Sequence, residues 1–255
     1  MLSNGTLTAF GLYMMRTSAM VLASPALGSA HNFAASKVGL IAILSLVFYL
    51  ATGFPLVENV GAVEFAALSM RELLIGFALA MVLQLALMVV RIAGDLIGNE
   101  MGLTMAGVAD PVTGVSTPLV AQMYEGLFLI GLFAVDGHHV LLRGLFDSFD
   151  RAPVGQVELS AALGENIVRL FAEMFRAGLV FAAPTLVFLT LVSLLIGLIG
   201  RAVPQVHVME LGFSLRVLGA LVAMVTFAPL LGPAMGRLYE QIQTATERVL
   251  MVIEG

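Results

Sequence analysis

The chain has 255 residues, of which 60% are hydrophobic and only 11% are charged, and its mean hydropathy is +1.02. A soluble domain is roughly 45–50% apolar and about 25% charged, so the composition indicates a membrane protein with little extramembrane mass. Cysteine is absent, which excludes disulfides, thiolate metal sites and cysteine nucleophiles. The net charge of −5 gives no indication of a basic surface that would bind nucleic acid.

Apolar segments of about membrane-spanning length follow one another along the chain, since a spanning helix needs roughly 20 apolar residues. No alternation typical of strands is sustained anywhere, so we predict an all-α, integral-membrane-type fold. The predicted segments are residues 1–24, 38–57, 73–90, 119–142, 177–200 and 211–236.

Two further regions have the pattern of amphipathic helices. In residues 143–176, acids and arginines recur at helical spacing, and the carboxyl-terminal tail from residue 237 onward repeats this character. Acid–arginine pairs four residues apart support a helix by a few tenths of a kcal/mol each. Both regions are therefore expected to be helical.

Several apolar segments contain groups that lipid does not tolerate. An ionised side chain inside a bilayer costs several kcal/mol unless it is paired or hydrated, and a proline breaks a helix where lipid offers no replacement hydrogen bond. These features predict helices that pack against other subunits around a cavity. The residues are Arg16, Glu125, Asp136 and Arg216, with Pro184, Pro229 and Pro233.

A polar stretch, residues 91–118, interrupts the otherwise apolar chain, and we expect it to form a functional loop held in place by the helices around it. The residue before a proline is pushed out of the α region, so Asp110-Pro111 should end any preceding helix. Met101 and Met105 are flexible side chains that can form a deformable constriction, although ordinary packing is the alternative. The loop itself is either an extramembrane connector or a gate inserted into an aqueous path.

Only one cluster suggests metal or catalytic chemistry, and the pattern argues against both. In Asp136-Gly137-His138-His139, adjacent histidines on a helix point about 100° apart, so the sequence predicts a helix end rather than a metal site. No nucleophile or metalloprotease motif occurs. We expect no enzyme activity, no metal and no cofactor.

The motifs taken in order resemble the FliR family of flagellar export-gate proteins and its counterpart in virulence type III secretion. The resemblance covers about residues 10–235. The chain departs from the family in having Asp136 where glycine is frequent, and Val208-Met209 in place of a common Val-Phe. The motifs are Arg16 with Pro25; Arg71-Glu72-Leu73-Leu74-Ile75-Gly76; Ala93-Gly94 with Gly102; Asp110-Pro111; Asp136-Gly137-His138; Ser148-Phe149 before Pro153; Arg201-Ala202-Val203-Pro204-Gln205; and Gly212-Phe213.

This resemblance implies a non-enzymatic subunit of a helical hetero-oligomeric export gate, built from helical hairpins. Its expected partners are P-type and Q-type gate subunits, other membrane proteins of the flagellar basal body, and unfolded rod, hook and filament proteins. The expected location is the bacterial inner membrane. The chain would be one subunit domain, 1–255, with hairpins at 1–100 and 119–255 and a plug-like loop at 101–118.

The resemblance also assigns roles to residues. The pore or plug loop would contain Met101, Gly102, Met105, Gly107, Asp110, Pro111, Gly114 and Pro118. Structural and assembly roles fall to Arg16, Pro25, Arg71, Glu72, Gly76, Gly94, Gly137, His138, Pro184, Arg201, Pro204 and Gln205. Two alternatives stay open: a virulence-type export gate, and a stand-alone secondary transporter with a binding site at broken helices.

Overall fold

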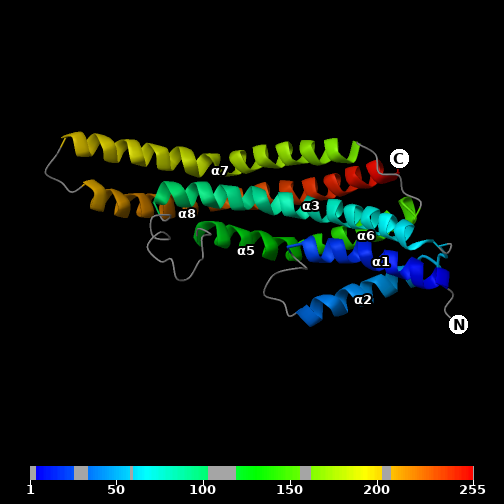
Figure 1. Cartoon of the computed structure of the whole chain (residues 1–255). Helices are drawn as coiled ribbons and strands as arrows, with labels where there is room; N and C mark the ends of the chain where they lie inside the picture. The colour runs from blue at the N-terminus through cyan, green and yellow to red at the C-terminus, as the bar shows by residue number, and fades with distance from the viewer. Residues whose placement is uncertain are drawn as a thin grey trace. The chain divides into compact units, whose positions relative to one another are not determined.

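A computed structural model describes residues 4–25, 34–57, 60–102, 119–155, 162–202 and 208–254. Over these ranges the chain forms seven helices and no strand (Figure 1), which confirms the predicted all-α class. The helices are α1 (Asn4–Ala23), α2 (Ala34–Ala51), α3 (Ala62–Met101), α5 (Leu119–Ala134), α6 (Gly137–Arg151), α7 (Ala162–Ala202) and α8 (Val208–Glu254).

Three helices are much longer than the apolar segments that predicted them. α3 has 40 residues, α7 has 41 and α8 has 47, because each joins an apolar segment to an adjoining amphipathic one. The helical prediction for the carboxyl-terminal tail is confirmed, since α8 continues to Glu254. The polar residues 91–101 were expected to belong to the loop. They instead continue the helix and form the last turns of α3.

The prediction that prolines break the helices is wrong. Pro184 lies inside α7, and Pro229 and Pro233 lie inside α8. A proline removes one backbone hydrogen bond and crowds the preceding turn. A helix of this length retains its many other backbone bonds on both sides of each proline, so the helical path continues.

Fewer helices qualify as membrane spans than the six predicted segments. Among the described residues, α3, α7 and α8 are long and apolar enough to cross a membrane, and the bent pair α5–α6 would make a fourth. The apolar part of α2 is shorter, residues Ala35–Ala51. The spanning window of α3 is 67% buried within the chain, whereas those of α7 and α8 are only 22% and 11% buried.

The chain divides into two compact units. The first comprises Met1–Leu85, Leu132–Phe171 and Tyr239–Gly255, and the second comprises Ala86–Gly131 and Ala172–Leu238. In the first unit α1 packs against α2, and an aromatic cluster joins them to α6. The Tyr13 ring stacks on Phe149 with 4.2 Å between centroids, and it meets Tyr49 edge-on at 5.5 Å.

The end of α8 completes the first unit. Its buried side chains recur at helical spacing, so one face of this amphipathic segment is covered by protein. On that face Thr246 lies against Gly144 of α6, where a Cβ atom would come within 2.5 Å of the threonine methyl. The buried positions are Ile242, Ala245, Thr246, Val249, Leu250 and Ile253.

In the second unit the helices approach one another at glycines. A Cβ atom on Gly94 of α3 would overlap the backbone of Ala121 on α5. Gly178 of α7 similarly faces the backbone of Val89, with the Val89 carbonyl oxygen 3.1 Å from the position of a Cβ. Between α7 and α8, the Phe188 and Phe227 rings meet edge-on, 6.4 Å apart. Small residues therefore set the helix spacing on both sides of α3.

We predict that Gly94→Ala destabilises the chain by about 1–3 kcal/mol, the usual cost of overpacking, because the methyl group would enter the Ala121 backbone. The matched control is Gly126→Ala on α5, where a Cβ would meet nothing within 4 Å. That change should be neutral or stabilising by up to about 1 kcal/mol. Thermal unfolding of the detergent-solubilised protein measures both, and equal melting temperatures would contradict the close α3–α5 approach.

Candidate functional site

The strongest polar feature is a buried arginine cluster, formed by Arg16, Glu72, Ser148 and Ala152 in the first unit. The Arg16 side chain is fully buried, and its Nε donates to Glu72 Oε2 at 2.6 Å. Nη1 donates to the Ser148 carbonyl oxygen at 2.6 Å and to Ser148 Oγ at 3.2 Å. Nη2 donates to the Ala152 carbonyl oxygen at 3.0 Å. One guanidinium thus joins α1, α3 and the end of α6.

The remaining faces of the two charges are also occupied. Glu72 Oε1 accepts a hydrogen bond from the Gly155 N–H at 3.3 Å, and the Arg16 guanidinium carbon lies 4.6 Å from the centroid of the Phe149 ring. A buried ion pair is tolerated only when further hydrogen bonds satisfy both groups, and a planar guanidinium over an aromatic face gains a cation–π interaction. The sequence predicted that Arg16 faces other subunits around a cavity, whereas its partners here all lie within the same chain.

Gly76 explains how α3 comes close enough to α1 for this pairing. A Cβ atom at Gly76 would clash with the Arg16 carbonyl oxygen, and it would lie 2.9 Å from the Ala19 methyl. Glu72 is four residues earlier, so it lies on the same face of α3, one turn away. The glycine and the glutamate of the Arg71–Gly76 motif therefore act together: one permits the contact and the other uses it.

The residues around this cluster have different environments. Pro25 follows the end of α1 and is half-buried, and the preceding Ala23 carbonyl accepts a hydrogen bond from Gln84 Nε2 at 2.7 Å. Arg71 is exposed next to the buried Glu72. In the second unit's helices, Pro184 and Arg201 are both exposed on α7. The structure brings Arg16, Glu72 and Gly76 together and leaves Pro184 and Arg201 on the surface of the chain.

A second ion pair lies in the second unit, between α3 and α5. Arg91 Nη2 donates to Glu125 Oε1 at 2.9 Å and to Oε2 at 2.8 Å, and Nε contributes a third bond at 3.2 Å. The Arg91 side chain is 48% exposed and that of Glu125 is 24% exposed. Glu125 lies within a predicted apolar segment, and its charge is neutralised by Arg91 of the neighbouring helix α3. Arg216, in contrast, has a buried Nε with no hydrogen-bond partner among the described residues.

The start of the predicted loop is described. Met101 ends α3 and is 3% exposed. Gly102 adopts a left-handed conformation with φ of 79°, its N–H donates to the Asn99 carbonyl oxygen at 3.0 Å, and a Cβ here would lie 3.4 Å from the Phe213 ring. A left-handed glycine is a common helix terminator, so α3 ends where the loop begins. Outside the described residues lie Met105, Gly107, Asp110, Pro111, Gly114, Pro118, Pro204 and Gln205.

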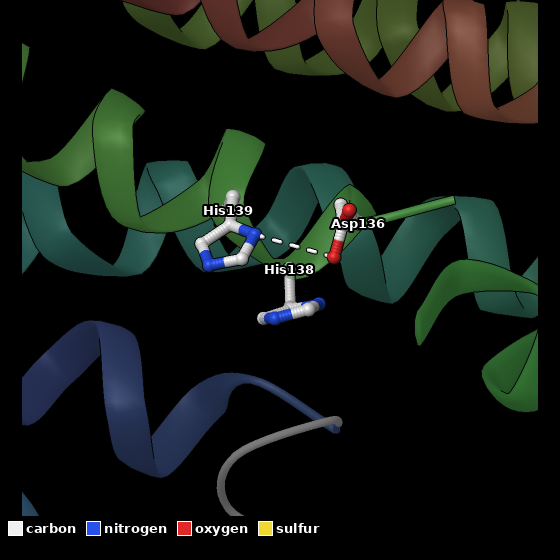
Figure 2. Close-up of side chains that lie close together, drawn as sticks. All are labelled: Asp136, His138 and His139. Atoms are coloured by element: carbon white, nitrogen blue, oxygen red, sulfur yellow. Dashed lines mark ion pairs between the residues drawn. The ribbon is translucent and has the colours of Figure 1, made fainter. Parts of the chain in front are cut away.

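The break between α5 and α6 gathers an acid and two histidines (Figure 2). Asp136 is left-handed with φ of 56° and precedes Gly137, the first residue of α6. A Cβ on Gly137 would lie 3.1 Å from the Leu132 carbonyl oxygen. The His138 ring lies 5.1 Å from Phe133 and 4.1 Å from His139, between centroids. The predicted helix end is confirmed here as the start of α6.

The geometry defines an all-α protein with long apolar helices and internally paired charges, in keeping with a membrane protein. The chain belongs to the family described as bacterial export proteins, family 1, whose model matches residues 7–242. It is similar to the flagellar biosynthetic protein FliR of Escherichia coli (strain K12), with 29% identity over 231 residues, 90% of this chain and 87% of the relative.

A second relative is the flagellar biosynthetic protein FliR of Bacillus subtilis (strain 168), with 29% identity over 214 residues, 82% of each chain. That of Aquifex aeolicus (strain VF5) is 30% identical over 174 residues, 66% of this chain and 65% of the relative. The chain is thus FliR-like, and the family places it among the components of the flagellar export apparatus.

We predict that Arg16→Leu destabilises the first unit by about 3–5 kcal/mol, because it leaves the Glu72 carboxylate buried without its partner. Arg16→Leu combined with Glu72→Leu should recover part of that loss, since no unpaired charge remains. A double-mutant cycle from thermal unfolding in detergent measures this coupling.

The matched control is Arg91→Leu, which removes a partly exposed partner of a carboxylate. Exposed ion pairs contribute about 0–1 kcal/mol, so this variant should unfold close to the parent chain. Similar losses for Arg16→Leu and Arg91→Leu would contradict the burial of the Arg16 cluster.

Proposed function

We propose that the chain is a structural, pore-forming subunit of the flagellar type III protein export gate. In this role it helps to pass unfolded rod, hook and filament proteins across the bacterial inner membrane, within the flagellar basal body. Its partners are P-type and Q-type gate subunits, together with other membrane proteins of the export apparatus. It catalyses no reaction; its contribution is to form and seal the path.

The observation that carries the proposal is the unequal covering of the long apolar helices. The spanning window of α3 is mostly buried within the chain, whereas 22% of the window in α7 and 11% of that in α8 are buried. Large apolar side chains such as Leu191, Leu194 and Val225 are more than half exposed. Family membership gives these uncovered faces a reason, because neighbouring gate subunits would cover them.

Charge supports the same interpretation. Arg216 lies on α8 among exposed apolar side chains such as Leu215 and Leu218, and its Nε has no hydrogen-bond partner among the described residues. A guanidinium facing hydrocarbon is costly, but one facing a protein neighbour or a hydrated path is not. Subunits packed around an aqueous pore provide both environments.

The plug is proposed to be the loop that begins at Gly102 and ends at Pro118. Two residues at its start support this proposal: Met101, the last residue of α3, is buried, and Gly102 adopts the left-handed conformation that ends helices and lies next to Phe213. Glycines and prolines in the rest of the loop favour irregular backbone, which membrane proteins tolerate where it is covered by protein or lines a water-filled path. A loop of this kind can close a pore and yield to an unfolded chain.

We predict that deleting residues 106–116 makes the membrane permeable to small ions when the whole gate is expressed. Conductance across the membrane, or a fluorescent ion-leak assay in cells, measures the effect. The matched control adds Arg16→Leu to the deletion, because a destabilised subunit should fail to build the gate and the leak should disappear. Cells that stay ion-tight while the deleted subunit still co-purifies with its partners would contradict the plug assignment.

We also predict that mild detergent extraction recovers this chain with heterologous subunits. Native mass measurement should give a complex containing P-type and Q-type subunits, and the isolated chain should aggregate because its α7 and α8 faces are uncovered. A stable monomer with a bound small solute would instead indicate a stand-alone transporter, and would contradict the export-gate proposal.

A further inference from the structure

The start of α6 carries three metal-ligand side chains within reach of one another. His139 Nδ1 and Asp136 Oδ1 are 3.5 Å apart, and one ligand atom from each of Asp136, His138 and His139 lies within 4.8 Å of the other two. Figure 2 shows the carboxylate and both imidazole rings at the first turn of the helix. We propose that these residues form a zinc site.

The left-handed residue before the helix brings a carboxylate to the histidine pair. Adjacent helical residues point about 100° apart, yet the two imidazole centroids are only 4.1 Å apart, with 35° between the ring planes. Asp136 lies just before the helix in the left-handed conformation, and its carboxylate is placed beside His139. The turn therefore supplies the third ligand on the side where the two rings meet.

The distances fit a small tetrahedral ion. With zinc–ligand bonds of about 2.0–2.1 Å, neighbouring ligand atoms are separated by about 3.3 Å, close to the 3.5 Å between His139 and Asp136. The longer separations need modest side-chain rotation. Asp136 and His139 are 76% and 57% exposed, so both are free to rotate toward an ion.

The donor set selects the class of metal. Two imidazoles and one carboxylate suit zinc and similar transition metals, whereas magnesium and calcium prefer oxygen ligands alone. Three protein ligands leave a fourth position for water. His138 adds an independent indication: its Nδ1 is buried and has no hydrogen-bond partner among the described residues, which is a costly state for a polar atom and one that a bound ion or its water would relieve.

Such an ion would link the residue before α6 to the first turn of the helix. It would fix Asp136 in its left-handed conformation and hold both rings on one side of the chain. This role is independent of the proposed export function, since it concerns one turn within the first unit.

The test is zinc binding by the full-length chain in its detergent-extracted assembly, carrying a purification tag without histidine and treated first with a chelator. We expect one zinc ion per chain, and a cobalt-substituted sample with the visible absorption of four-coordinate cobalt. His138→Ala and His139→Ala should each weaken zinc binding by about tenfold or more, at least the loss produced by changing an outer-shell partner.

Asp136→Asn separates the ligand role from the fold, because asparagine also tolerates the left-handed conformation. It should weaken zinc binding while leaving the zinc-free melting temperature unchanged. The matched controls are His31→Ala and His207→Ala, which should leave zinc binding unaltered. Equal zinc binding by the parent chain and a His138→Ala/His139→Ala variant, or loss of binding in either control, would overturn the proposal.

Discussion

The first unit depends on a single buried charge pair. Arg16 and Glu72 are 0% and 1% exposed, and separating them inside an apolar protein would leave two uncompensated charges. Because the guanidinium also binds the Ser148 and Ala152 carbonyl groups, its position fixes α1, α3 and the end of α6 together. The Phe149 ring, stacked on Tyr13, lies against the Arg16 guanidinium, and excluding water on this side strengthens the electrostatic interaction.

The two charge pairs show how the chain handles polar groups in apolar helices. The Arg16–Glu72 pair is buried and joins α1 to α3. The Arg91–Glu125 pair is partly exposed to solvent and joins α3 to α5. Each pair lies close to a glycine of α3, Gly76 or Gly94, that lets the partner helix approach. Close backbone contact and charge pairing therefore occur at the same crossings, and α3 carries both.

The sequence was sufficient for the class of fold, and the family resemblance singled out Arg16, Glu72 and Gly76 without indicating that they lie together. An arginine in an apolar segment has to be paired or hydrated, but the sequence does not show that the partners of Arg16 lie within the same chain. The other hydrogen-bond partners of Arg16 cannot be predicted from sequence. Ser148 and Ala152 contribute backbone carbonyl oxygens, which every residue possesses. The Arg91–Glu125 pair was missed because its members are 34 positions apart, and no periodic pattern connects them.

The prolines of α7 and α8 have a consequence for any surface that lies against them. Pro184 has no N–H, so the carbonyl of Val180 lacks its usual donor one turn earlier, and Pro229 has the same effect on Val225. Both valines are strongly exposed. Each of these two apolar faces therefore contains a backbone carbonyl oxygen without its helical donor, a group to which a neighbouring hydroxyl, amide or water can donate.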